Sequence, residues 1–214
     1  RRQRLELWFL SNDSSRIFSN STDWLFGVYT LNNDEGLRRE YTYLTSDFYS
    51  DYEFDTAAAF FQLDSMLSEK LTLETGIRVE KRDTTYQDSE LLSYSPSETL
   101  WGGRVAIKYL LNSNSMTYAS IARGYKAGGF NTDGTLDADL REFDEEFLIE
   151  YELGVKSNLL DNTLHLKAAL FHDDRNEQQV KSSTGRIRAN GSTEFIDFIG
   201  NAAEGTNNGV EFAA

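Results

Sequence analysis

The sequence predicts an all-β protein, an antiparallel transmembrane β-barrel segment, and three observations support this fold class. Apolar residues recur at every second position in most segments, which is the period of a strand and not of a helix. The 214 residues contain one proline, so long strands form without losing backbone donors. Short and long polar connections alternate along the chain, as in membrane barrels with short turns on one rim and long loops on the other.

Nine strands are predicted, and many reach the ~9–11 residues of a tilted membrane strand. They lie at residues 4–10, 23–31, 54–63, 71–81, 100–110, 116–125, 147–157, 163–173 and within 195–214. In the first two, large apolar side chains share one face: Leu5, Leu7 and Phe9, then Trp24, Phe26 and Val28. The third is rich in alanine and phenylalanine, and alternates less clearly.

The fourth strand, 71–81, shows the clearest alternation. Its two faces are Leu71, Leu73, Ile77 and Val79 on one side, and Thr72, Glu74, Arg78 and Glu80 on the other. The fifth repeats this pattern, with Trp101, Val105, Ile107 and Tyr109 opposite Arg104 and Lys108. Each strand therefore has one face suited to lipid and one suited to a hydrated interior.

The remaining strands follow the same rule. Segment 147–157 sets five apolar residues against Glu150, Glu152 and Lys156, and segment 163–173 sets leucines and an alanine against His165 and Lys167. The last strand is expected to break near residues 204–208. Short connections are predicted at 64–70, 112–115 and 159–162, with a longer one at 11–22. Long loops are predicted at 32–53, 83–99, 126–146 and 182–194.

Composition excludes several classes of protein. Mean hydropathy is −0.52, and no run approaches the ~18 apolar residues of a membrane helix. The net charge of −14 argues against nucleic acid, which binds clustered Lys and Arg. The absence of cysteine excludes disulfides and thiolate metal sites. The alternation of short and long connections, and not the composition, favours a membrane barrel over its alternative, a soluble β-domain.

Several motifs, in order, resemble the barrel of TonB-dependent receptors. They are the hairpin of 59–62 and 71–78, the strand and glycine-rich bend of 118–131, the Glu-x-Glu-x-Gly-x-Lys strand of 150–157, and the short segments 169–174, 178–180, 201–203 and 209–211. The resemblance covers most of residues 5–212. It is closest to the siderophore-type receptors of that family.

The resemblance implies about nine consecutive strands of a larger, 22-stranded barrel in the bacterial outer membrane. Residues 1–214 would be a partial barrel domain without the plug domain and the C-terminal strands. The parent would take up a scarce nutrient, and the expected nutrient is a ferric siderophore complex. Its partners would be outer-membrane lipid, the siderophore, and the TonB complex through the absent plug. Open alternatives are a TonB-independent outer-membrane channel and a soluble secreted glycan-binding β-domain.

Residues with distinctive chemistry point to no catalytic, cofactor or metal site. The glycine spacing of 124–129 does not fit a nucleotide loop, and the acidic segment after Asn131 lacks the glycine of a calcium loop. His165 and His172 lie seven apart on one strand, so they face opposite sides. The candidates for contact with an anionic ligand are Arg104, Arg123 and Lys126. The sequence therefore predicts a transporter segment and not an enzyme.

Overall fold

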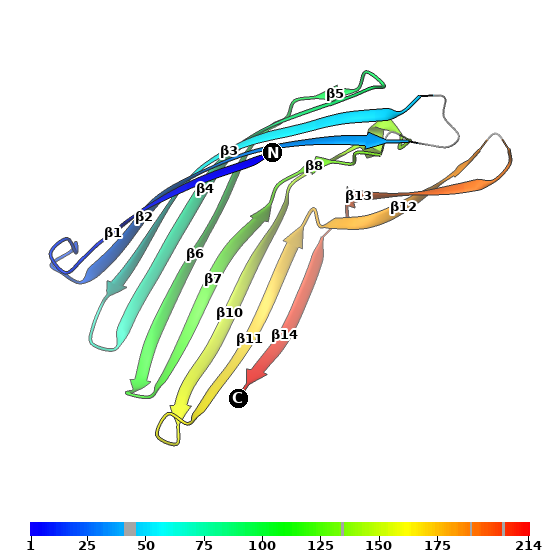
Figure 1. Ribbon diagram of the computed structural model, residues 1–214. Helices are drawn as coiled ribbons and strands as arrows, with labels where there is room; N and C mark the ends of the chain where they lie inside the picture. The colour runs from blue at the N-terminus through cyan, green and yellow to red at the C-terminus, as the bar shows by residue number, and fades with distance from the viewer. Residues whose placement is uncertain (41–45, 134, 189, 203) are drawn as a thin grey trace.

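The computed structural model describes residues 1–40, 46–133, 135–188, 190–202 and 204–214. It is one large curved antiparallel sheet with extensions at one end (Figure 1). Its nine main strands pair in the order β1-β2-β3-β4-β6-β7-β10-β11-β14. Their bounds are β1 Arg2–Leu10, β2 Thr22–Arg39, β3 Phe48–Met66, β4 Leu71–Asp88, β6 Ser97–Asn112, β7 Ser115–Lys126, β10 Glu146–Leu159, β11 Leu164–Asn176 and β14 Gly205–Ala213. The all-β antiparallel fold class is confirmed.

Five further strands and one turn of helix complete the secondary structure of the described residues. They are β5 Ser93–Tyr94, β8 Gly129–Phe130, η1 Ala138–Leu140, β9 Glu142–Phe143, β12 Gln179–Ile187 and β13 Thr193–Asn201. Strand β5 pairs with β4, β8 with β9, and β12 with β13. None of the helical structure in the described ranges is long and apolar enough to cross a membrane.

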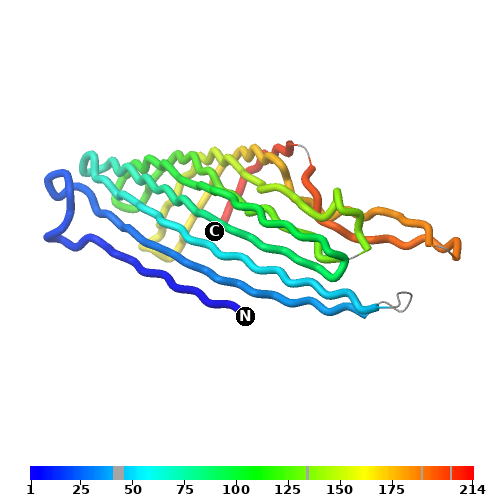
Figure 2. Tube along the Cα trace, turned by 90° about the horizontal axis from the view of Figure 1, so that it is seen from above, coloured from blue at the N-terminus to red at the C-terminus, as the bar shows by residue number. Residues whose placement is uncertain are grey.

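The two ends of the strands differ. The connections at one end, the short-turn rim, are residues 11–21, 67–70, 113–114 and 160–163. At the other end, the long-loop rim, the connections carry the additional strands: β5 lies between β4 and β6, β8 and β9 between β7 and β10, and β12 and β13 between β11 and β14. Figure 2, a view from above, shows the sheet open between β1 and β14, so the first and last main strands are both edges.

The sheet has one apolar and one polar face, and cross-strand register fixes which residues share each. Phe26, Phe61 and Ile77 are directly opposite one another on adjacent strands, and so are Leu153 and Leu170. The large exposed apolar side chains of this face include Leu5, Leu7, Phe9, Val79, Val105, Ile107, Ile121, Val155, Val210 and Phe212. The opposite face carries Arg78, Glu80, Arg104, Lys108, Glu150 and Glu152.

Aromatic residues mark both edges of the apolar face. On β6, Trp101 lies toward the long-loop rim and Tyr109 toward the short-turn rim. Eight residues separate them, or about 26 Å along an extended strand. With a strand tilt of about 35–45°, this corresponds to about 20 Å along the barrel axis, somewhat less than the ~25 Å apolar band of membrane barrels.

The main strands are longer than predicted at the long-loop rim. Residues 32–39 and 48–53 were expected in a loop, but they extend β2 and β3 as a paired ribbon. Beyond the apolar band both faces of a strand can be polar, so the ladder continues after the hydrophobic alternation has ended. Parts of three predicted loops and of the last predicted strand, namely residues 41–45, 134, 189 and 203, lie outside the described residues.

The predicted strand within 195–214 is in fact two strands in different sheets. Residues 193–201 form β13, which pairs with β12 in a projecting hairpin, and residues 205–213 form β14, which pairs with β11. The predicted loop 182–194 therefore lies largely in this hairpin. The break expected near residues 204–208 lies between the two strands, just before β14 begins.

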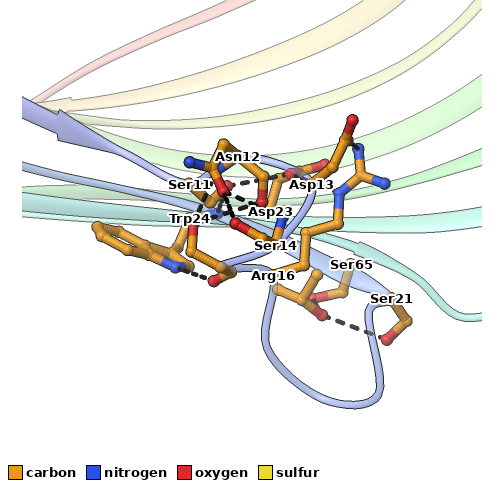
Figure 3. Close-up of polar contacts among 11 residues, drawn as sticks. Ser11, Asn12, Asp13, Ser14, Arg16, Ser21, Asp23, Trp24 and Ser65 are labelled. Atoms are coloured by element: carbon orange, nitrogen blue, oxygen red, sulfur yellow. Dashed lines mark hydrogen bonds and ion pairs between the residues drawn. The ribbon is translucent and has the colours of Figure 1, made fainter.

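Side chains hold the longest connection of the short-turn rim (Figure 3). Asp23 accepts hydrogen bonds from Ser11 Oγ at 3.0 Å and from Arg16 Nε at 2.8 Å. The indole Nε1 of Trp24 donates to the Ser15 carbonyl at 2.9 Å. The turn is therefore fixed to the start of β2 at two successive residues.

Substituting Trp24→Phe tests this attachment. The ring area is largely kept, but the Ser15 carbonyl loses its indole donor, which is expected to lower the free energy of unfolding by about 1 kcal/mol. Urea unfolding of the refolded full-length protein in detergent measures the change. An unchanged midpoint at an unchanged slope would show that water replaces the indole without cost.

Candidate functional site

The polar face at mid-height carries a hydrogen-bonded network between β4 and β7. Arg78 Nη2 lies 2.7 Å from Glu80 Oε2, and the Tyr125 hydroxyl donates to the same oxygen at 3.0 Å. The Arg78 guanidinium also lies over the rings of Tyr29 and Phe60, at 5.0 and 5.8 Å from their centroids. Residues of the neighbouring strands thus fix the Arg78 guanidinium on the polar face of the sheet, which we call the polar wall. Its position suits a negatively charged group.

Arg82, which follows Arg78 and Glu80 on the same face of β4, is less completely paired. Its guanidinium carbon lies 3.9 Å from the centroid of the Phe54 ring, and Nη2 donates to the Tyr52 hydroxyl at 3.0 Å. Its Nε is buried without a hydrogen-bond partner among the described residues. A buried donor without a partner is costly, so Arg82 is well suited to receive an acceptor from a ligand.

Above Arg82, the loop after β7 folds onto the polar face. Phe130 of β8 stacks on Tyr86 at 5.5 Å and contacts Tyr94 at 5.1 Å and Tyr52 at 6.2 Å between ring centroids. The contact with Tyr52 places β8 near the long-loop end of β3. This aromatic cluster brings the loop, β3, β4 and β5 together at the long-loop rim.

A buried ion pair locks the same loop in place. Arg141, 2 % exposed at its side chain, lies 3.2 Å from Asp88 Oδ2, whose side chain is fully buried. Arg141 also donates to the Tyr86 hydroxyl at 3.0 Å and to the Leu136 carbonyl at 3.1 Å. The buried Arg141 guanidinium therefore has both an opposite charge and further hydrogen-bond acceptors, which a buried ion pair requires.

The Tyr86 hydroxyl adds a hydrogen bond to the buried ion pair, in which it is the donor and Asp88 the acceptor. Tyr86 lies beyond the apolar band, since the residues that follow Val79 on the apolar face of β4 are Lys81, Asp83 and Thr85. Burial, with the hydrogen bond to Asp88 as a second cause, raises the pKa of Tyr86 to about 12. The hydroxyl therefore stays protonated at neutral pH and donates to the Asp88 carboxylate at 2.9 Å.

The β12–β13 hairpin is joined to the loop by side-chain amides. Asn131 donates from Nδ2 to the Ile199 carbonyl at 2.7 Å and accepts from the Ile199 backbone N–H at 2.8 Å. Asn201 Oδ1 accepts from the Asp144 N–H at 2.7 Å. Gln179 Nε2 donates to the Ala127 carbonyl at 2.8 Å. The loop and the hairpin thus form one assembly at the long-loop rim.

The three predicted ligand contacts are not brought together. Arg104 is on the polar face, where Nη2 donates to Ser120 Oγ at 3.4 Å. Arg123 is on the apolar face, because its register partner is Gly103 while Arg104 pairs with Ala122. Lys126 ends β7 opposite Glu146. Lys126 is in the same alternation of β7 as Ala122, the register partner of Arg104, so Lys126 and Arg104 follow the polar alternation at different heights of the sheet, and only Arg123 lies on the other face.

The histidines also lie apart. At the start of β11, His165 Nδ1 is 2.8 Å from Asn158 Oδ1. Further along β11, His172 Nδ1 is 2.6 Å from Oδ1 of Asn208, which belongs to β14. Within the described ranges, no three His, Asp or Glu side chains are grouped closely enough to hold a metal ion.

Sequence reasoning missed the residues of the aromatic cluster and the buried ion pair at the long-loop rim. These residues, which we call the upper site, are Tyr86, Asp88, Phe130 and Arg141. All lie within or beside segments predicted as long polar loops, where no strand period points a residue to either face. The one available signal was the high aromatic content of segments 86–94 and 125–130, which is unusual for a loop in free solution.

Comparison with known proteins gives a consistent result. The family model described as "TonB dependent receptor-like, beta-barrel" matches residues 2–214. The chain is 28 % identical over 208 residues to the pesticin receptor of Yersinia pestis, and the match covers 92 % of this chain and 29 % of that protein. The pesticin receptor of Yersinia enterocolitica matches with the same identity and coverage.

Two solved structures share the fold. The ferric yersiniabactin uptake receptor FyuA of Yersinia pestis superposes with a TM-score of 0.76 at 24 % identity, covering 99 % of this chain and 32 % of that one. The ferric-catecholate import receptor Fiu of E. coli K12, in its closed form, gives 0.73 at 15 % identity, covering 99 % and 34 %. The chain spans about a third of the length of these relatives.

Proposed function

The chain belongs to the TonB-dependent receptor β-barrel family, and on that premise we propose that it forms nine strands of an outer-membrane receptor that imports a ferric siderophore. The family consists of transport receptors and not of enzymes. The observation that carries the proposal is the division of the nine-strand sheet into a continuous apolar face and a continuous polar face. Such a sheet meets lipid on one side and water on the other.

The choice of ligand class is supported by the relatives and by the polar face. FyuA takes up ferric yersiniabactin and Fiu imports ferric catecholates, as their names state. In this chain Arg78 and Arg82 lie beside aromatic rings below the loop assembly. Cations next to aromatic rings suit a ligand that is both anionic and aromatic. Outer-membrane lipid would contact the apolar face, and TonB would act through a plug domain outside this chain.

Uptake of ⁵⁵Fe by cells tests the proposal. The full-length receptor is expressed in an iron-starved strain that lacks its own siderophore receptors, with ferric yersiniabactin and a ferric catecholate as probes. We expect receptor-dependent uptake of at least one probe and its loss when TonB is deleted. Receptor-dependent uptake that persists without TonB, or uptake of neither probe, would contradict the proposal.

A single substitution locates the ligand on the wall. Arg82→Gln is expected to lower uptake about tenfold at subsaturating probe, because one charge-assisted hydrogen bond contributes roughly 1.5–3 kcal/mol. Lys81→Gln is the matched control, since Lys81 is the adjacent residue on the opposite face of β4. Equal uptake by the two variants would show that Arg82 does not contact the ligand.

A further inference from the structure

The apolar face contains a groove between four neighbouring strands. It has a volume of about 600 Å³ and lies over β6, β7, β10 and β11. Its floor is Ala119, which lies between Ile107 and Leu153 in the cross-strand register. A small residue between two large ones leaves a channel in a face that is otherwise covered by long side chains. All four strands have neighbours on both sides, so completing the barrel leaves this groove uncovered.

Arg123 lies on the same face of β7, two residues beyond Ile121 toward the long-loop rim. Its guanidinium carbon is 4.3 Å from the centroid of Trp101 and 4.6 Å from that of Phe147, and Nη1 donates to the Trp101 carbonyl. No carboxylate of the described residues forms an ion pair with it. Asp174 lies in the same cross-strand row beyond Ile149, and its Oδ1 is 3.1 Å from the ring nitrogen Nε2 of His172.

This cation is held where a membrane headgroup would be. Trp and Tyr collect at the level of lipid headgroups, so the Trp101 ring places Arg123 at that level. Two rings fix the guanidinium plane and limit its freedom to turn away into water. A guanidinium matches phosphate through paired N–H donors, and at least one edge of Arg123 remains available for such bonds.

We propose that the groove holds one acyl chain of an anionic, phosphate-bearing membrane lipid whose headgroup contacts Arg123. The inference rests on the proposed function to the extent that the apolar face meets a membrane. The groove supplies apolar contact along the chain, and Arg123 supplies the charge that selects phosphate. Neither feature is needed for the transport path, because both lie on the face opposite the polar wall.

Native mass spectrometry of the full-length receptor tests the proposal, with dioleoylphosphatidylglycerol as the probe. The wild type is expected to retain one lipid that resists detergent exchange. Arg123→Gln and Ala119→Phe should each weaken retention about tenfold, the equivalent of about 1.4 kcal/mol. Arg123→Lys should keep part of it, since the charge remains but the fork geometry is lost.

Ala59→Phe is the matched control. Ala59 is exposed on the same apolar face between Val28 and Val79, away from the groove, and should retain lipid as the wild type does. Heat-modifiable gel mobility shows which variants are folded, and Ala119→Leu replaces Ala119→Phe if the larger ring prevents folding. Retention that is equal in Ala119→Phe and Ala59→Phe, or unchanged in Arg123→Gln, would overturn the proposal. Loss of ferric siderophore uptake would not affect this readout, so the two proposals fail separately.

Discussion

Replacing Arg141 by methionine is expected to release the loop between β7 and β10 from the polar face. The substitution leaves the Asp88 carboxylate buried and without its cation, and breaking a buried pair in this way costs about 3–5 kcal/mol. The sheet does not depend on this pair, so the cost falls on the docking of residues 127–145. Hydrogen exchange of the full-length receptor should show lost protection in that loop and in β12–β13, with the nine main strands unchanged.

The double variant Arg141→Met with Asp88→Asn is the control. A neutral amide leaves no uncompensated charge, and its carbonyl oxygen would still accept from the Glu90 and Leu92 N–H groups, so much of the protection should return. Equal exchange in the single and double variants would mean that the aromatic cluster around Phe130 holds the loop without the ion pair.

Substituting Gly154→Val is expected to prevent efficient folding of the barrel. A Cβ at this position would lie 2.4 Å from the Tyr118 ring, which lies across the glycine from the adjacent strand. The same arrangement recurs where Phe60 covers Gly27 and where Phe171 covers Gly209. Overpacking typically costs about 1–3 kcal/mol, and the Tyr118 ring that would have to move is flanked by Lys156, whose Nζ lies 5.0 Å from its centroid. The folded fraction after refolding into detergent, read from heat-modifiable mobility, measures the effect.

Two variants separate a steric clash from a loss of glycine itself. Gly124→Ala, at a glycine with open space around its Cβ position, should refold like the wild type. Adding Tyr118→Ala to Gly154→Val should recover much of the folded fraction, because the obstructing ring is gone. Failure of that rescue would show that backbone conformation, and not the ring, requires glycine at residue 154.

The sequence predicted the nine-strand sheet well because burial in a membrane imposes a simple rule. Each residue in the apolar band of such a barrel faces either lipid or water, so apolar and polar residues alternate along segments such as 71–81 and 147–157. The position of β14 was less clear, because Gly205–Ala213 carries only Val210 and Phe212 as large apolar residues.

The candidate site could not be predicted to the same extent. Arg123 and Arg104 were both candidates for contact with an anionic ligand, but they differ by one position in register and face opposite sides. The Arg141–Asp88 pair joins residues 53 apart through a loop that has no periodic pattern. Such contacts depend on where an irregular backbone folds, which local propensity and hydrophobic alternation do not encode.

The amide bonds between the loop and the hairpin also set an order of assembly. In the main sheet each strand through β11 pairs with the strand that comes before it, so these pairings need only nearby chain. Asn131 and Ile199, by contrast, are 68 residues apart. The loop after β7 therefore waits for β10 to β13 before it meets its partner, and closing this long segment is among the slower steps available to the chain. The bonds between this loop and the hairpin are therefore expected to form after the pairing of the main strands from β1 to β11.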